Sequence, residues 1–210
     1  AAVLPRGMYR DIVIARPGMG AVRNFINGYY PDGQLVLQID DDVDDVLTVT
    51  GPNDLTSVPN LHDVFVRGFR TMLDFGATLW GIYPVANAYF MQRDPITTDL
   101  RYIVGALFGV LNAHAPHCQV SLDDKEDFQR TILHYLHSGS VVRLNDTTLK
   151  TRYYKEPGGM QVTRTEDRVL ASAHLLAQRY PDLARVNNSK ANGMAEIRLK
   201  DRRSRVEAAP

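Results

Sequence analysis

Cysteine, excess charge and long apolar runs are all missing or rare in this sequence, and each absence excludes a class of protein. The single cysteine, Cys118, cannot form an internal disulfide and fits a reducing compartment. The 24 basic residues are balanced by 24 acidic ones, so no net charge attracts the whole molecule to nucleic acid. No apolar run approaches the roughly 20 residues of a membrane-spanning helix. The first residues lack the features of a secretory signal, so we expect a cytoplasmic protein that does not enter a membrane.

The composition is that of one folded domain. Hydrophobic residues make up 44% of the chain and charged residues 23%, which is typical of globular proteins. We find no internal repeat and no linker that would divide 210 residues, a length that suits a single core. We therefore expect one domain over residues 1–210, with a shortened amino end and a flexible tail at 201–210. Basic residues gather between Arg185 and Arg205, where either phosphate contact or a solvated tail is expected.

The pattern of apolar residues predicts alternating strands and helices. Strands are expected at residues 9–15, 34–40, 79–83, 102–110 and 141–144, and helices at 20–30, 59–75, 125–137 and 166–179. Such alternation predicts an α/β fold with a mostly parallel central sheet and helices on both faces. In sheets of this kind, ligands bind beyond the carboxyl ends of the strands.

Three consecutive aspartates follow the apolar run that ends at Ile39. Carboxylates so close together repel one another unless a cation neutralises them. Along an extended segment, Asp40 and Asp42 face the same way, so we expect them to converge on one Mg²⁺ or Mn²⁺ ion while Asp41 points elsewhere. A metal held by two carboxylates keeps positions open for diphosphate oxygens. The alternative is a solvated acidic turn, because Asp44 and Asp45 follow directly.

Several segments taken together resemble a known family. They are RPGMGAVRNFI, LQIDDDV, WGIYPVANAYFM, TTDLRYIVGALFGV, KEDF and YYKEPGGMQ. In their order and spacing they are similar to the TET-associated glycosyltransferases, phage and kinetoplastid enzymes related to the glucosyltransferase that makes base J. The resemblance extends from about Arg16 to Lys200 and implies the A-type, nucleotide-diphospho-sugar transferase fold.

The same resemblance implies an activity and its partners. It implies inverting transfer of a sugar from a UDP-sugar to the hydroxymethyl group of 5-hydroxymethylcytosine or 5-hydroxymethyluracil in DNA. Mn²⁺ or Mg²⁺ would be the cofactor, and the site of action would be the host cytoplasm if a phage encodes the chain. A transferase acting on protein or polysaccharide, and a nucleic-acid-binding relative without catalysis, are the alternatives that we keep open.

The resemblance also assigns roles to the acidic residues. Asp40 and Asp42 stand in the metal motif, and Asp41 lies beside the ribose of the donor. Glu126 and Asp127 match a second acidic motif, in which Asp127 is the catalytic base and Glu126 orients the donor-sugar hydroxyls. A carboxylate is chemically suited to take the proton of a hydroxyl nucleophile. Alternatively, these acids only favour the start of a helix.

Further residues are expected to bind the donor. Arg23 and Asn24 open a helix after glycines, where phosphate binds readily, although a plain surface arginine is equally compatible. The resemblance also implies that Gly105 lies in the glycine-containing stretch of the A-type fold, beside the donor sugar and acceptor. The late histidine that serves most A-type enzymes as a metal ligand is missing, since His174 is the last; Asn187, Asn188, Lys190 or water would replace it, and we assign Lys190 to the donor.

The acceptor is expected to lie between aromatic residues. The loop with Tyr153 holds aromatics that can stack on a base and glycines that allow close approach, and a hairpin with core tyrosines is the alternative. Trp80, Tyr83, Asn87 and Tyr89 are expected to line the same cleft, unless the aromatics are simply core. The acceptor-binding residues in the loop are Tyr154, Lys155, Gly158 and Gly159.

Histidines and glycines give two weaker signals. His114, His117 and Cys118 lie close in sequence but lack a fourth ligand at a matching spacing, so we expect no zinc there. His134 and His137 share one face of a helix, where surface or core positions are the expected explanation. The glycines after Arg16 match a dinucleotide fingerprint only loosely, which disfavours a dehydrogenase.

Overall fold

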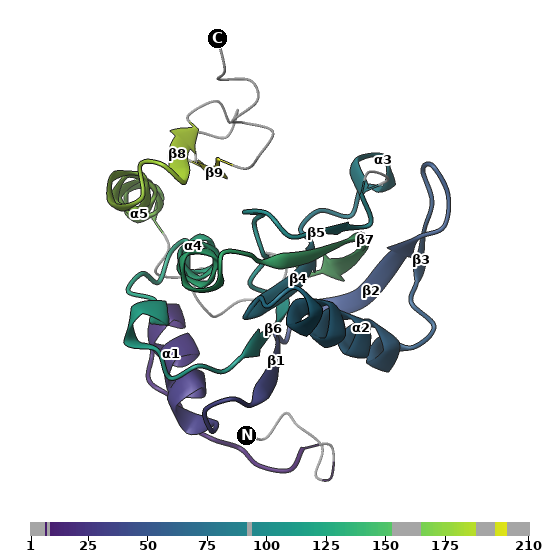
Figure 1. Cartoon of the computed structure of the whole chain (residues 1–210), viewed down its shortest axis with the longest axis horizontal. Coiled ribbons are helices and arrows are strands. Elements are labelled where there is room, and N and C mark those ends of the chain that lie inside the picture. The colour runs from purple at the N-terminus through teal and green to yellow at the C-terminus, as the bar shows by residue number, and fades with distance from the viewer. Residues whose placement is uncertain (1–6, 8, 92–93, 153–164, 188–195, 201–210) are drawn as a thin grey trace.

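The structure is a computed structural model, and it describes residues 7, 9–91, 94–152, 165–187 and 196–200. Its centre is a seven-stranded mixed sheet (Figure 1). The strands are β1 (Leu35–Ile39), β2 (Val43–Val49), β3 (Leu55–Ser57), β4 (Leu79–Tyr83), β5 (Ile96–Thr97), β6 (Leu107–Leu111) and β7 (Val142–Thr151). Their order in space is β1-β6-β4-β7-β2-β3, and β5 pairs with β7 beside this path.

Helices cover both faces of this sheet, as expected. They are α1 (Met19–Tyr29), α2 (Leu61–Asp74), α3 (Ala88–Met91), α4 (Glu126–Ser138) and α5 (Glu166–Arg179), with a 3₁₀ turn η1 (Pro116–Cys118). Side chains alternate across each strand, so Trp80 packs with Met72 of α2 on one face. Leu79 packs on the other face with Ile26 of α1 and Tyr135 of α4. The expected helices at 20–30, 59–75, 125–137 and 166–179 are confirmed to within two residues at each end.

A third apolar cluster joins α4 to the last elements of the chain. It contains Ile132 of α4 together with Ala173 and Leu176 of α5. Ala184 and Ile197 belong to the same cluster. They lie in a short two-stranded sheet formed by β8 (Ala184–Asn187) and β9 (Glu196–Leu199). α4 therefore contacts the main sheet on one side and the α5, β8 and β9 unit on the other (Figure 1).

β1 and β2 are close in sequence but four places apart in the sheet, so the sheet has to curl. Only residues 40–42 separate them. The step from Ile39 to Val43 spans at most about 14 Å, whereas four strand spacings in a flat sheet cover about 19 Å. β7 carries the bend, because it pairs with β4 through Val142 to Leu144 and again at Thr148, while Thr147 to Thr151 pair with β2. The curl lets the acidic turn bridge two distant strands.

The expectation of a mostly parallel sheet was wrong. Among the described strands, only β4 and β7 form a parallel pair. A parallel return usually runs through a crossover helix, whereas the chain between β4 and β6 forms only the four-residue α3 and the short strand β5. β6 therefore enters the sheet antiparallel and begins at Leu107, later than the expected start at 102. The segment 9–15 contains no strand, and β2, β3, β5, β8 and β9 were not expected.

Trp80 belongs to the core, which corrects its assignment to the acceptor. Its side chain is fully buried between α2 and the sheet, and its ring lies edge-on to Phe69. Gly68 of α2 and Gly109 of β6 leave the space that the indole fills, since a Cβ at either position would lie within 2.5 Å of it. Trp80 therefore fixes the distance between α2 and the sheet and cannot reach a ligand.

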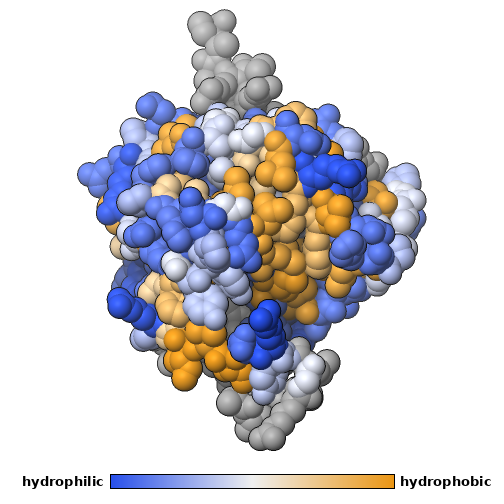
Figure 2. Space-filling view, turned by 60° about the horizontal axis from the view of Figure 1, so that its bottom comes forward, coloured by the Kyte–Doolittle hydropathy of each residue, from blue (hydrophilic) through white to orange (hydrophobic). Residues whose placement is uncertain are grey.

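An apolar groove runs beside α2 on the outer surface. Its volume is about 490 Å³, and Leu35 of β1 forms one wall while Phe65, Val66, Phe69 and Leu73 of α2 form the other. The view with these elements turned forward shows a broad apolar area on this face (Figure 2). Among the described residues, no helix combines the length and apolar character that a membrane span requires.

Candidate active site

The site lies where the parallel strands end. β1, β4 and β7 run in the same direction, so their carboxyl ends share one edge of the sheet with the start of β6. Asp40 follows β1 there, and its backbone N–H donates to the carbonyl oxygen of Ala106 at 2.9 Å. The second acidic motif opens α4, whose first residue is Glu126. The fold thus brings two segments more than 80 residues apart to one edge.

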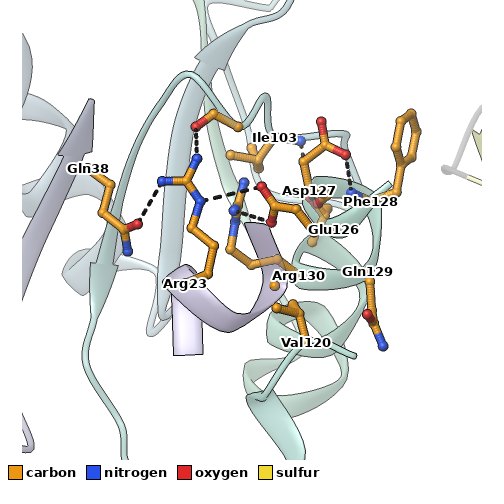
Figure 3. A network of polar contacts seen from close by, with 12 residues as sticks. Arg23, Gln38, Ile103, Val120, Glu126, Asp127, Phe128, Gln129 and Arg130 are labelled. Atoms are coloured by element: carbon orange, nitrogen blue, oxygen red, sulfur yellow. Dashed lines mark hydrogen bonds and ion pairs between the residues drawn. The ribbon is translucent and has the colours of Figure 1, made fainter. Parts of the chain in front are cut away.

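Arg23 of α1 connects both acidic motifs. Its Nη2 donates to Asp40 Oδ1 at 2.9 Å and to the carbonyl oxygen of Gly105 at 3.0 Å. Its Nε lies 3.4 Å from Glu126 Oε1, and its Nη1 donates to Gln38 Oε1 at 2.9 Å (Figure 3). Burial works against its charge, but the carboxylates of Glu126 and Asp40 raise the pKa of Arg23 above its ordinary value. A buried cation therefore lies at the centre of the site.

Glu126 lies between two guanidinium groups. Its second oxygen, Oε2, accepts from Arg130 Nη1 at 2.7 Å (Figure 3). Arg130 also stacks over the ring of Phe108, with 3.6 Å to the ring centroid. Burial raises the pKa of the Glu126 carboxyl, while Arg130 and Arg23 oppose the shift by favouring the charged form. Both oxygens are engaged and the side chain is 7% exposed, so Glu126 positions the two arginines, and its expected contact with the donor-sugar hydroxyls stays a prediction.

Gly105 allows its backbone to lie close to Glu126 and Asp127 in this network. A Cβ at Gly105 would lie 3.3 Å from Glu126 Oε1 and 3.6 Å from the Cβ of Asp127. The glycine therefore lets the segment before β6 pass against the first turn of α4. Its carbonyl oxygen remains available to Arg23.

The three aspartates form a turn, which corrects the expected extended geometry. Asp41 and Asp42 are the turn residues between β1 and β2, and Val43 N–H approaches the carbonyl oxygen of Asp40 at 3.5 Å. Alternation along a strand therefore does not apply to Asp40 and Asp42. Burial raises the pKa of the Asp42 carboxyl, and the neighbouring Asp40 and Asp41 raise it further. Asp41 is exposed.

Asp127 is the part-exposed carboxylate of the second motif. Its Oδ2 accepts a short hydrogen bond from the Tyr102 hydroxyl, and its Oδ1 accepts from the Phe128 N–H at 2.9 Å. The ring of Tyr102 stacks on that of Phe128, with 4.1 Å between centroids. These contacts hold the carboxylate in one orientation beside Gly105.

The structure gives Asn24 and the start of α1 other roles than donor binding. The Asn24 amide donates to the carbonyl oxygen of Val120 at 2.8 Å and accepts from its N–H at 3.0 Å. The Asp123 carboxylate accepts from the Gly20 N–H at 3.0 Å, so an anion from the protein already caps the helix. This contact competes with the phosphate binding that we expected at this helix end, and Asn24 fixes the loop before α4.

A small polar cavity lies beside Tyr83 at the end of β4. Its volume is about 170 Å³, which is below the usual range of about 300–1,000 Å³ for ligand pockets and suits one ring-sized group. Arg143 and Asn145 of β7 line it, and the Arg143 guanidinium stacks over the Tyr83 ring at 4.8 Å. Asn87 and Tyr89 are exposed near α3, and the Asn87 side chain accepts from the Tyr89 N–H.

Comparison of the chain with protein-family models, with curated proteins and with solved structures finds no match. The function therefore has to be argued from the site itself.

Several expected site residues lie outside the described part of the chain. They are Lys190, Tyr154, Lys155, Gly158 and Gly159.

Three described residues of the site were not expected from the sequence. Gln38 is a polar residue in an apolar run, Arg130 follows Glu126 at helical spacing, and Tyr102 has no sequence signal. The first two signals are readable in the sequence, because a buried polar side chain needs a partner and residues four apart meet on a helix.

Proposed function

We propose that the chain is a metal-dependent inverting glycosyltransferase of the A-type fold. It moves a sugar from a UDP-sugar to the hydroxymethyl group of a modified pyrimidine in DNA. The observation that carries the proposal is the Arg23 network, because one buried side chain contacts Asp40, Gly105 and Glu126. The segments that contain these residues are the ones on which the family resemblance depends.

The acidic turn fits a divalent cation. Burial and then the charge of Asp40 raise the pKa of Asp42 and outweigh the opposing charge of Arg152, so the carboxylate form is disfavoured, and a hard cation would favour it. Asp40 gives one oxygen to Arg23 and is part-exposed, so its second oxygen is open to a metal. When bound, the cation neutralises charge that develops on the diphosphate leaving group. Arg23 holds Asp40 in place for this role.

Asp127 is the base in this proposal. The acceptor hydroxyl oxygen forms a bond to the anomeric carbon while the bond from that carbon to the diphosphate breaks, and the hydroxyl proton passes to Asp127. Tyr102 and the Phe128 N–H orient the carboxylate for this step. Tyr102 also connects the base to the polar cavity, since its carbonyl oxygen accepts from Arg143 at 3.4 Å. We assign the Tyr83 cavity to the acceptor base.

A panel of nucleotide sugars tests the activity. Each is incubated with Mn²⁺ and DNA that contains 5-hydroxymethylcytosine or 5-hydroxymethyluracil, and the nucleosides are weighed by mass spectrometry. We expect a hexose-mass product from a UDP-sugar with the wild type and a rate lower by about 10²–10⁴-fold in Asp127→Asn. Exposed Asp63→Asn is the matched control. Turnover that is unchanged in Asp127→Asn, or the absence of product and of released UDP in every reaction, would overturn the proposal.

A further inference from the structure

Two histidines and the only cysteine of the chain meet on the surface of α4. His117 and Cys118 lie in η1, and His137 lies in the last turn of α4. One ligand atom from each, a ring nitrogen or the sulfur, can be chosen so that all three lie within 4.8 Å of one another. His117 Nε2 is 2.7 Å from His137 Nδ1. Among the described residues, no other group of three or more potential ligands converges in this way.

This grouping was not expected, because the sequence offered no fourth ligand beside His114, His117 and Cys118 and gave His134 and His137 surface or core positions. His134 shares a helix face with His137, but its ring is buried and Nδ1 lies 2.8 Å from Thr78 Oγ1. The ligand next to His137 is instead supplied by a turn 20 residues earlier, which packs against the end of the helix. We propose that His117, Cys118 and His137 form a Zn²⁺ site, with water as the fourth ligand, that joins η1 to α4.

The distances suit a tetrahedral ion after movements of up to about 1.2 Å, because the ligand atoms now lie within 4.8 Å of one another. Zn–N bonds of about 2.0–2.1 Å and a Zn–S bond of about 2.3 Å place neighbouring ligand atoms about 3.3–3.6 Å apart. The two imidazoles therefore separate by about 0.6 Å from their present 2.7 Å contact. Both rings are exposed and can make this movement, whereas Cys118 is buried and holds the sulfur in place.

The donor set and its surroundings favour a borderline metal over a hard one. Two imidazoles and a thiolate suit Zn²⁺ or Co²⁺, while Mn²⁺ and Mg²⁺ prefer oxygen ligands. The site also lies at the carboxyl end of α4, where the helix dipole favours positive charge.

Co²⁺ titration of the chelator-treated protein tests the site. We expect one Co²⁺ per chain, with the absorption of a thiolate-to-Co²⁺ charge transfer and of a tetrahedral ion, and Zn²⁺ should displace it. His137→Gln should weaken binding by more than about 100-fold, since loss of an outer-shell partner alone costs 10–100-fold. His62→Gln, which changes an exposed histidine on α2, should leave the titration unchanged.

The variants separate this site from the acidic turn and from simple misfolding. Cys118→Ser should lose the charge-transfer absorption, and His137→Gln, at an exposed position, tests binding without altering a buried side chain. Asp42→Asn should leave the Co²⁺ absorption as in the wild type. The proposal is overturned if the wild type shows no charge-transfer absorption, if that absorption persists in Cys118→Ser, or if His137→Gln binds Co²⁺ like the wild type.

Discussion

His134 is a buried histidine that the fold keeps neutral. Burial and then the charge of Arg130 lower the pKa of its ring to about 3 from an ordinary value of 6.5. In the unfolded chain the ring takes up a proton below pH 6.5, whereas the folded protein cannot accommodate it. Stability is therefore complete above pH 6.5 and is lost progressively as the pH falls toward 3.

The loss of stability that His134 causes at low pH can be isolated with His134→Gln. This variant keeps a polar partner for Thr78 but does not titrate. Between pH 7.5 and pH 5 the wild type should lose about 2 kcal/mol of unfolding free energy that the variant does not lose. Urea unfolding of both proteins at the two pH values gives this difference. Equal pH dependence in the two proteins would show that His134 is not held neutral in the core.

Arg23 shows what could be predicted for single residues of the site. Its position after the glycines marked it for the site, and Asp40 and Glu126 were identified as acidic motifs. Their connection could not be predicted, because the ion pairs cross 17 and 103 residues of sequence. The burial of a side chain could not be predicted from the sequence either. We therefore expected Trp80 to contact the acceptor, although its side chain is fully buried.

Close packing of α2 on the sheet gives a prediction for an element. Gly68 of α2 faces the Trp80 ring, and a Cβ there would lie 2.5 Å from ring carbon atoms. Gly68→Ala should therefore push the helix away from the sheet and lower stability by about 1–3 kcal/mol, although alanine favours helix. Chemical unfolding measures this loss.

Gly28→Ala is the matched control for this substitution. Gly28 also lies in a helix, α1, but a Cβ there meets nothing within 4 Å. This variant should gain about 0.4–1 kcal/mol from the reduced freedom of the unfolded chain. If Gly68→Ala were as stable as Gly28→Ala, the close contact between α2 and Trp80 would be wrong.

Helices were predicted better than strands for a physical reason. A helix such as α5 depends on local hydrogen bonds and a periodic apolar face, so its bounds can be read from the sequence. The direction of β6 and the pairing of β2 depend on how the chain returns to the sheet, which no local pattern encodes. The sheet is therefore mixed and curled, whereas the sequence predicted a mostly parallel sheet.

At the scale of the whole molecule, the curl decides where the functional groups meet. The acidic turn joins β1 to a strand four places away, and α4 brings the second acidic motif to the same edge. Arg23 connects the two motifs from a third element, α1. The proposed donor site therefore depends on the curl of the sheet as a whole.

Mn²⁺ uptake in the presence of UDP tests this donor site most directly, and electron paramagnetic resonance of free Mn²⁺ measures it. The wild type should bind one Mn²⁺ per chain with UDP, and Asp42→Asn should weaken this binding by more than about 10-fold. Asp44→Asn should behave as the wild type, because Asp44 pairs with Arg152 at 2.7 Å, outside the turn. Mn²⁺ uptake by Asp42→Asn equal to that of the wild type would contradict a metal-dependent donor site at the acidic turn.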